Sequence, residues 1–109
     1  MSNDDLTKDL FKSRAVEVAI REVAKAFGFS PQQIIGRESK RELQQVRHLA
    51  ITLAHEFSGA TNVELGRRFD RRATSIAYSI LACGDALAKH DFYRTRADDI
   101  RKAIAEALR

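Results

Sequence analysis

Basic and hydroxyl side chains gather in two short stretches of this 109-residue sequence. They are Arg37, Lys40, Arg41 and Arg47 in the first stretch, and Arg67, Arg68, Arg71, Arg72, Thr74 and Ser75 in the second. Guanidinium groups donate paired hydrogen bonds to guanine and also bind phosphate oxygens, and hydroxyl groups bond to bases or phosphates. These residue types predict a surface that binds double-stranded DNA.

Residues that could support catalysis or metal binding are few and unfavourably spaced. Cys83 is the only cysteine, so we expect a buried structural thiol and no intramolecular disulfide or thiolate cluster. His48 and His55 are seven residues apart, whereas two histidines that share a zinc ion usually lie four apart on a helix. No arrangement of Ser, His and Asp, or of Cys and His, stands out. We therefore expect no enzymatic activity, no metal and no cofactor.

The composition is typical of one globular domain, 1–109, built from helices. Hydrophobic residues make up 44% of the chain, and it contains only one proline and five glycines. Nineteen Lys and Arg against fifteen Asp and Glu give a net charge of +4, which is compatible with a nucleic-acid partner. No apolar run reaches the ~18 residues of a membrane span, and no signal peptide is evident. We expect a cytoplasmic, nucleoid-associated protein without membrane contact.

The spacing of apolar residues predicts an all-α bundle of five to six helices. The first two cover Leu6–Phe27 and Ser30–Ile35, and the third begins near Leu43 and ends before Gly59. A short helix follows Thr61 and ends at about Arg68, and the last two cover Arg72 to about Lys89 and Thr95–Leu108. A polar connection, Gly36–Gln45, precedes the third helix. Gly28 is expected to end the first helix and Ser30 to cap the second, with Pro31 at its first position. Thr61 and Glu64 have the spacing of a capping box.

Three apolar stripes are expected to face the core. They comprise Leu10, Ala15, Ala19, Val23 and Phe27 on the first helix, Ile76, Ile80, Leu81 and Cys83 on the fifth, and Ile100, Ala103, Ile104 and Leu108 on the last. Gly66 is small enough for another segment to approach closely.

A short helix, a tight turn at Phe69–Arg71 and a longer helix, all within residues 61–89, have the plan of a helix-turn-helix. In that motif the second helix lies in the major groove and its first turn contacts base edges. Contacts to bases are therefore expected from Arg71, Arg72, Thr74, Ser75 and Tyr78. The basic cluster at Arg37, Lys40, Arg41 and Arg47 suits a narrow minor groove, as flexible basic loops do. Contacts to phosphates are expected from Arg37, Lys40, Arg47, Asn62, Arg67 and Arg68.

The stretch from about Val18 to Ala82 resembles the C-terminal DNA-binding domain of the bacterial replication initiator DnaA, a member of the Trp-repressor-like helix-turn-helix group. Residues 34–50, from Ile-Ile-Gly-Arg to Arg-His-Leu-Ala, match its basic loop and following helix without a gap. Glu64-Leu65-Gly66 with Phe69 matches its E-I-G…F segment. Residues 70–76 stand where the family has G-R-D-H-T-T-V, one glycine shorter.

The resemblance assigns roles to individual residues. It implies that Arg41 enters the minor groove, Arg47 contacts the DNA backbone, Arg71 is the motif arginine, and Thr74 and Ser75 replace the paired threonines. The acidic and histidine positions that contact bases in the family are Arg72 and Ala73 here, and Val63 replaces the proline that starts the helix. These departures affect recognition of the family's cognate box more than docking in the groove, so the resemblance implies the docking geometry and leaves the preferred sequence open.

The sequence lacks the G-x-x-x-x-G-K-[ST] phosphate-binding loop, so we expect no nucleotide binding. The leading hypothesis is a stand-alone DNA-binding regulator of transcription or replication initiation. The alternative is a protein-interaction module that kept the fold and binds an initiator or another regulator. Its candidate surface, for a homodimer or a partner, is the stripe at Ile100, Ala103, Ile104 and Leu108, unless that stripe packs on the first helix.

Overall fold

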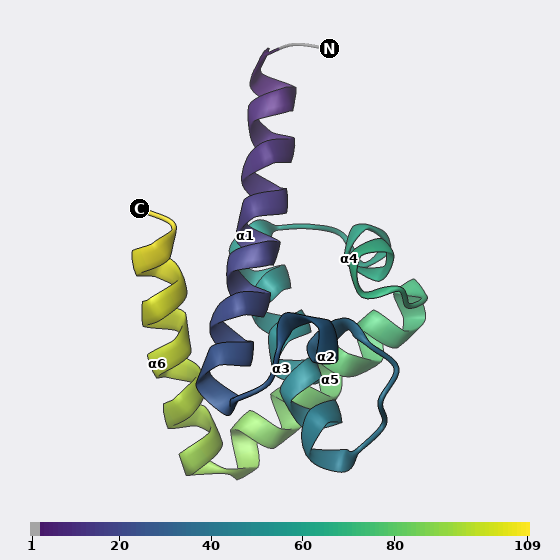
Figure 1. Ribbon diagram of the computed structural model, residues 1–109, viewed down its shortest axis with the longest axis vertical. Helices are drawn as coiled ribbons and strands as arrows, with labels where there is room; N and C mark the ends of the chain where they lie inside the picture. Colours follow the sequence, from purple (N-terminus) through teal and green to yellow (C-terminus); the bar gives the residue numbers. More distant parts are fainter. Residues whose placement is uncertain (1–2) are drawn as a thin grey trace.

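The computed structural model describes residues 3–109, with side chains described from Asp5 onward, and within this range all regular structure is helical. The helices are α1 (Asn3–Phe27), α2 (Pro31–Ile35), α3 (Arg41–Ser58), α4 (Asn62–Phe69), α5 (Ala73–Lys89) and α6 (Asp91–Ala107) (Figure 1). This confirms the predicted all-α bundle. In the described part of the chain, no helix combines the length and apolarity needed to cross a bilayer.

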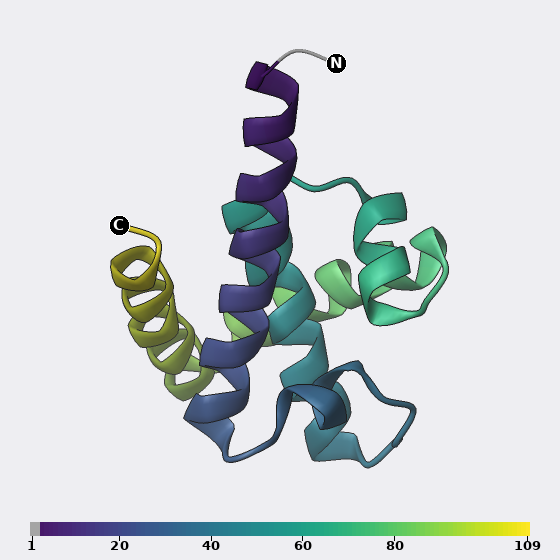
Figure 2. The same ribbon diagram turned by 45° about the horizontal axis from the view of Figure 1, so that its top comes forward.

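The core lies where α1, α3, α5 and α6 meet. Its largest fully buried side chains include Ile20, Leu49, Leu53, Ile76 and Ile104. Helices α1 and α6 run side by side in opposite directions, and α4 lies on the side of α1 opposite α6 (Figures 1 and 2). The helix-turn-helix is thus attached to the bundle mainly through α5, which packs on α3.

Local signals placed most helix ends correctly. Ser30 and Gln33 form a reciprocal capping box at α2, and Thr61 and Glu64 form a second one at α4. Gly28 and Gly59 have φ angles of 76° and 68°, which a residue without a Cβ adopts freely, and they follow the ends of α1 and α3. Two starts were predicted too late, because α3 begins at Arg41 and α6 at Asp91.

Two predicted core residues are exposed. Leu10 is 63% exposed because the first turns of α1 extend beyond the rest of the bundle (Figure 2). Leu81 is 71% exposed because it lies across α5 from the buried Ile76 and Cys83. The burial predicted for Cys83 is confirmed. Burial also raises the pKa of its thiol, since a low-dielectric environment disfavours the thiolate.

The apolar stripe of the last helix packs within the chain. Ile100 and Ile104 are buried, Ala103 and Leu108 are half-buried, and α6 lies against α1. The stripe therefore contributes to the core, which is the structural alternative that the sequence had left open.

Candidate nucleic-acid interface

The turn between α4 and α5 depends on Gly66. The backbone amide of Arg71 donates to the Gly66 carbonyl at 2.8 Å, and Asp70 adopts a left-handed conformation with φ 52°. A Cβ atom at Gly66 would collide with the carbonyl oxygen of Arg71. The close approach expected at Gly66 is therefore confirmed, and the approaching segment is the turn itself.

Arg71 joins this turn to the basic loop, which we define as residues 36–40. Its guanidinium donates to the carbonyl oxygens of Ile35 at 3.0 Å, Gly36 at 2.7 Å and Phe69 at 2.6 Å. Burial and the neighbouring charge of Arg37 lower the pKa of Arg71. The sequence placed Arg71 among the residues that contact bases, but in the structure its terminal nitrogens bind backbone.

Arg47 of α3 binds the same loop and the end of α2. Its side chain, 5% exposed, donates from Nε to the Ile34 carbonyl at 2.6 Å and from Nη2 to the carbonyls of Gln33 and Glu38, each at 3.1 Å. Burial is the main cause of its lowered pKa, and Arg71 adds to it. Arg47 was predicted to contact phosphate, but its guanidinium is bonded to three backbone carbonyls and the residue is buried at the base of the groove.

The other predicted base contacts do reach the surface, four of them around the start of α5, whereas Arg41, the first residue of α3, lines a separate hollow with Ala82 and His90. Arg41, Arg72, Thr74, Ser75 and Tyr78 are all exposed. Thr74, Ser75 and Tyr78 line an open groove of about 540 Å³ whose other wall includes Arg37 and Ser39 of the basic loop. The structure thus brings the first turns of α5 and the basic loop together on one surface, as the DNA-binding hypothesis requires.

Apart from Arg47 and Arg68, the predicted phosphate contacts lie in three places. Arg37 and Lys40 are exposed on the basic loop, and each pairs with a carboxylate, Arg37 with Asp70 at 2.8 Å and Lys40 with Glu38 at 3.2 Å. Arg67 lines a second open hollow, of about 700 Å³, beside the turn, together with the predicted base contact Arg72. Asn62 is the half-buried first residue of α4.

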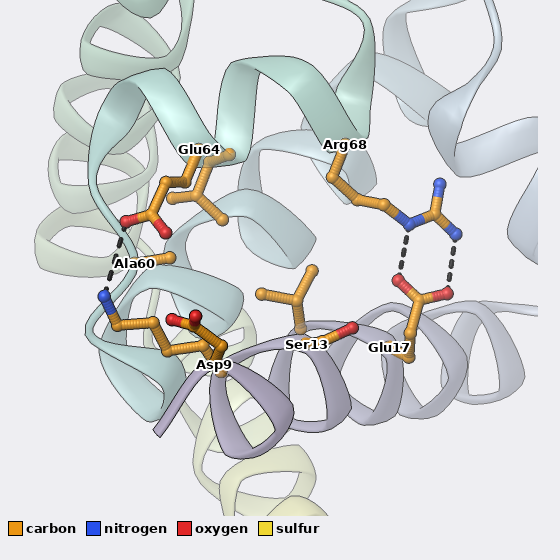
Figure 3. Close-up of a pocket in the computed structure, with 9 residues that line it drawn as sticks. Asp9, Ser13, Glu17, Ala60, Glu64 and Arg68 are labelled. Atoms are coloured by element: carbon orange, nitrogen blue, oxygen red, sulfur yellow. Dashed lines mark hydrogen bonds and ion pairs between the residues drawn. The ribbon is translucent and has the colours of Figure 1, made fainter. Parts of the chain in front are cut away.

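Arg68 points toward α1. Its Nε and Nη2 atoms donate to the Glu17 carboxylate at 2.5 and 2.6 Å, across a cleft of about 330 Å³ between α1 and α4 (Figure 3). These bonds raise the pKa of Arg68. At the other end of the cleft, Lys12 of α1 approaches Glu64 of α4 at 3.5 Å. Both ion pairs connect α4 to α1, so Arg68 is separated from the surface that Thr74 and the basic loop share.

The sequence analysis missed His48 and Gln44, which line the groove with Tyr78. The His48 ring meets the Tyr78 ring edge to face, with centroids 6.0 Å apart. Burial lowers the pKa of His48, and the charges of Arg47 and Arg71 lower it further. The helical periodicity of the sequence could have identified them, since Gln44 and His48 are one turn apart on the polar side of α3.

Residues 16–82, which include the basic loop and the helix-turn-helix, match the model of the family described as bacterial dnaA protein helix-turn-helix. The chain belongs to this family. The resemblance proposed from the residues is therefore confirmed, and α6 lies outside the matched part of this DnaA-type domain.

Two curated relatives give the extent of the similarity. The chromosomal replication initiator protein DnaA 1 of Chlamydia trachomatis is 30% identical over 87 residues, or 80% of this chain. The chromosomal replication initiator protein DnaA of Thermus thermophilus is 35% identical over 77 residues, or 66% of this chain. In both cases the match spans 18% of the relative, so the similarity is confined to one part of each initiator.

Proposed function

We propose that this protein binds double-stranded DNA, with α5 in the major groove and Arg41 in the adjacent minor groove. The observation that carries the proposal is the shared groove between the basic loop and the exposed residues Thr74, Ser75 and Tyr78. A helix that presents polar side chains at its first turn, beside a basic loop, fits the docking geometry of helix-turn-helix proteins. The family membership supports the same function.

The structure suggests a division of roles among the predicted site residues. Arg72, Thr74, Ser75 and Tyr78 would contact bases in the major groove, and Arg37, Lys40, Arg67 and Asn62 would contact phosphates. Arg47 and Arg71 would act as positioning residues, because their donors are bonded to the backbone carbonyls that shape the basic loop. Arg68 would position α4 on α1 through Glu17.

We further propose a regulatory role for this DNA binding. The relatives are named as chromosomal replication initiators, so DNA sites related to those of initiators are the first candidates for binding. We place the protein at the nucleoid as a stand-alone regulator of transcription or replication initiation. The rival hypothesis of a protein-interaction module has lost its supporting feature, since the stripe of α6 is packed against α1.

Fluorescence anisotropy with a labelled pool of random duplexes, at two or more salt concentrations, tests the proposal. If about five phosphates are neutralised, log K should fall with log salt at a slope of about −4 to −5. Selection of tight binders from the pool should then yield a preferred sequence. Absence of binding even at low salt would reject the proposal and favour the protein-interaction module.

A further inference from the structure

The outer face of α5 carries a leucine, Leu81, that makes none of the DNA contacts proposed above. Leu81 is 71% exposed, and Tyr78, one turn before it, is 66% exposed. Together with Thr74 they occupy helix positions i, i+4 and i+7, so the three form one row. The row lies opposite the buried Ile76 and Cys83. Large apolar side chains that adjoin one another at the surface indicate a contact surface, whereas isolated ones do not.

This row points in the direction that the proposed DNA complex requires. Thr74 and Tyr78 line the groove that α5 shares with the basic loop, and Leu81 continues the same row. At about 1.5 Å per residue, Thr74 and Leu81 are ~10 Å apart along the helix, the length of about three base pairs. Asp85 follows one turn later on this face, and a carboxylate there would oppose phosphates, so contact should end near Leu81.

We propose that Leu81, with Tyr78 beside it, packs against thymine C5-methyl groups and makes α5 selective for A·T pairs at the far end of its contact. The inference rests on the proposed DNA-binding function. The thymine methyl is the apolar group that base pairs present in the major groove. A leucine side chain has no hydrogen-bond donor or acceptor, so it distinguishes base pairs through that methyl and through shape.

Replacement of thymine by uracil tests this contact, because it removes the methyl and keeps every hydrogen-bonding group of the base. A duplex selected by the wild-type protein from a random pool is the probe, and its thymines are replaced one at a time. At one or two of them, wild-type affinity should fall by about three- to fourfold, the value of one buried methyl. Leu81→Ala should bind the thymine duplex correspondingly less tightly and should show no further loss with uracil at those positions.

Leu10→Ala is the matched control, since Leu10 is a leucine of similar exposure on α1, and it should retain the full uracil effect. Circular dichroism and thermal unfolding should show that both variants keep the wild-type fold. If Leu81→Ala responds to every uracil as the wild type does, or if no thymine methyl affects wild-type affinity, the inference is overturned while DNA binding stands. If the wild type binds no duplex at low salt, the proposed function fails, and the inference fails with it.

Discussion

Arg37 of the basic loop and Asp70 of the helix-turn-helix turn form an ion pair of 2.8 Å. Both side chains are exposed, at 72% and 81%, and both line the hollow beside Arg72. Asp70 therefore sets a negative charge next to the predicted phosphate contacts. In the proposed complex, phosphates would compete with this carboxylate for Arg37, so the pair would oppose binding even though it connects the basic loop to the turn.

Asp70→Asn should therefore strengthen DNA binding. Asparagine tolerates the left-handed conformation at this position, so the turn should be preserved. Loss of one exposed ion pair and one repulsive charge should raise affinity by about two- to fivefold at low salt, and by less at high salt. Anisotropy titrations at two salt concentrations measure this, with Asp98→Asn as the control, since Asp98 pairs with Arg101 on α6. An unchanged affinity for Asp70→Asn would show that Arg37 does not contact phosphate.

Gly66→Ala should destabilise the protein through the turn. The added methyl would meet the carbonyl oxygen of Arg71, a backbone atom that cannot move without disturbing the start of α5. We expect a loss of about 1–3 kcal/mol in the free energy of unfolding. Gly84→Ala is the matched control, because a Cβ there meets nothing within 4 Å, and alanine should stabilise the middle of α5 by up to ~1 kcal/mol. Urea denaturation of both variants compares them directly, and equal effects would contradict the role given to Gly66.

Arg47→Ala should both destabilise the fold and weaken binding to every DNA sequence. The substitution removes a buried group with three bonds to the carbonyls of residues 33, 34 and 38. Unsatisfied buried polar groups cost ~1–3 kcal/mol each, although water can enter near the loop and reduce this. Arg41→Ala, at an exposed position three residues after Glu38, should leave stability nearly unchanged. A stable Arg47→Ala variant with normal affinity would exclude the positioning role.

His48 should make stability and DNA binding respond to pH in opposite directions. Its pKa lies below 6.5 in the folded state, so the unfolded chain binds more protons, and the free energy of unfolding should fall as pH drops below about 6.5. Phosphates near the groove would favour the protonated ring, so DNA affinity should rise as pH drops. His48→Gln should reduce both trends relative to His90→Gln, a change at an exposed residue. Urea denaturation and anisotropy between pH 5 and 8 provide the two curves, and identical profiles for the two variants would contradict the assignment.

Features that depend on neighbouring residues in the chain could be predicted from the sequence. Both capping boxes and the glycines after α1 and α3 depend on residues within a few positions of one another. The number of helices and the helix-turn-helix could therefore be predicted from the sequence. The roles of Arg47 and Arg71 were not, because their partners are carbonyls more than eight residues away in the chain, apart from Phe69. One hint existed, since Arg47 shares a helix face with the buried Leu43 and Ala50.

The exposure of Leu10 and Leu81 could not be predicted for a different reason. Apolar periodicity shows which face of a helix is hydrophobic, but it does not show how far the neighbouring helices extend over that face. The start of α1 projects beyond the bundle (Figure 1), and the side of α5 opposite the buried Ile76 is exposed at Tyr78 and Leu81. An apolar residue that was expected in the core but is exposed on the predicted DNA-binding helix therefore indicates a candidate contact surface.

Arg72→Ala and Arg67→Ala should separate recognition of bases from binding of phosphates. Arg72 is exposed immediately before α5, where a guanidinium can form two hydrogen bonds with guanine, so its loss should cost about 1–3 kcal/mol on a selected duplex and little on random DNA. Arg67 lies at the end of α4 beside the same hollow, and its loss should weaken both duplexes alike and reduce the salt slope by about 1. Anisotropy titrations of both variants on both duplexes measure discrimination and salt dependence together. Because both arginines flank one turn, equal losses by the two variants on both duplexes would mean that they contribute only charge, and recognition would then have to come from Thr74, Ser75 and the row that ends at Leu81.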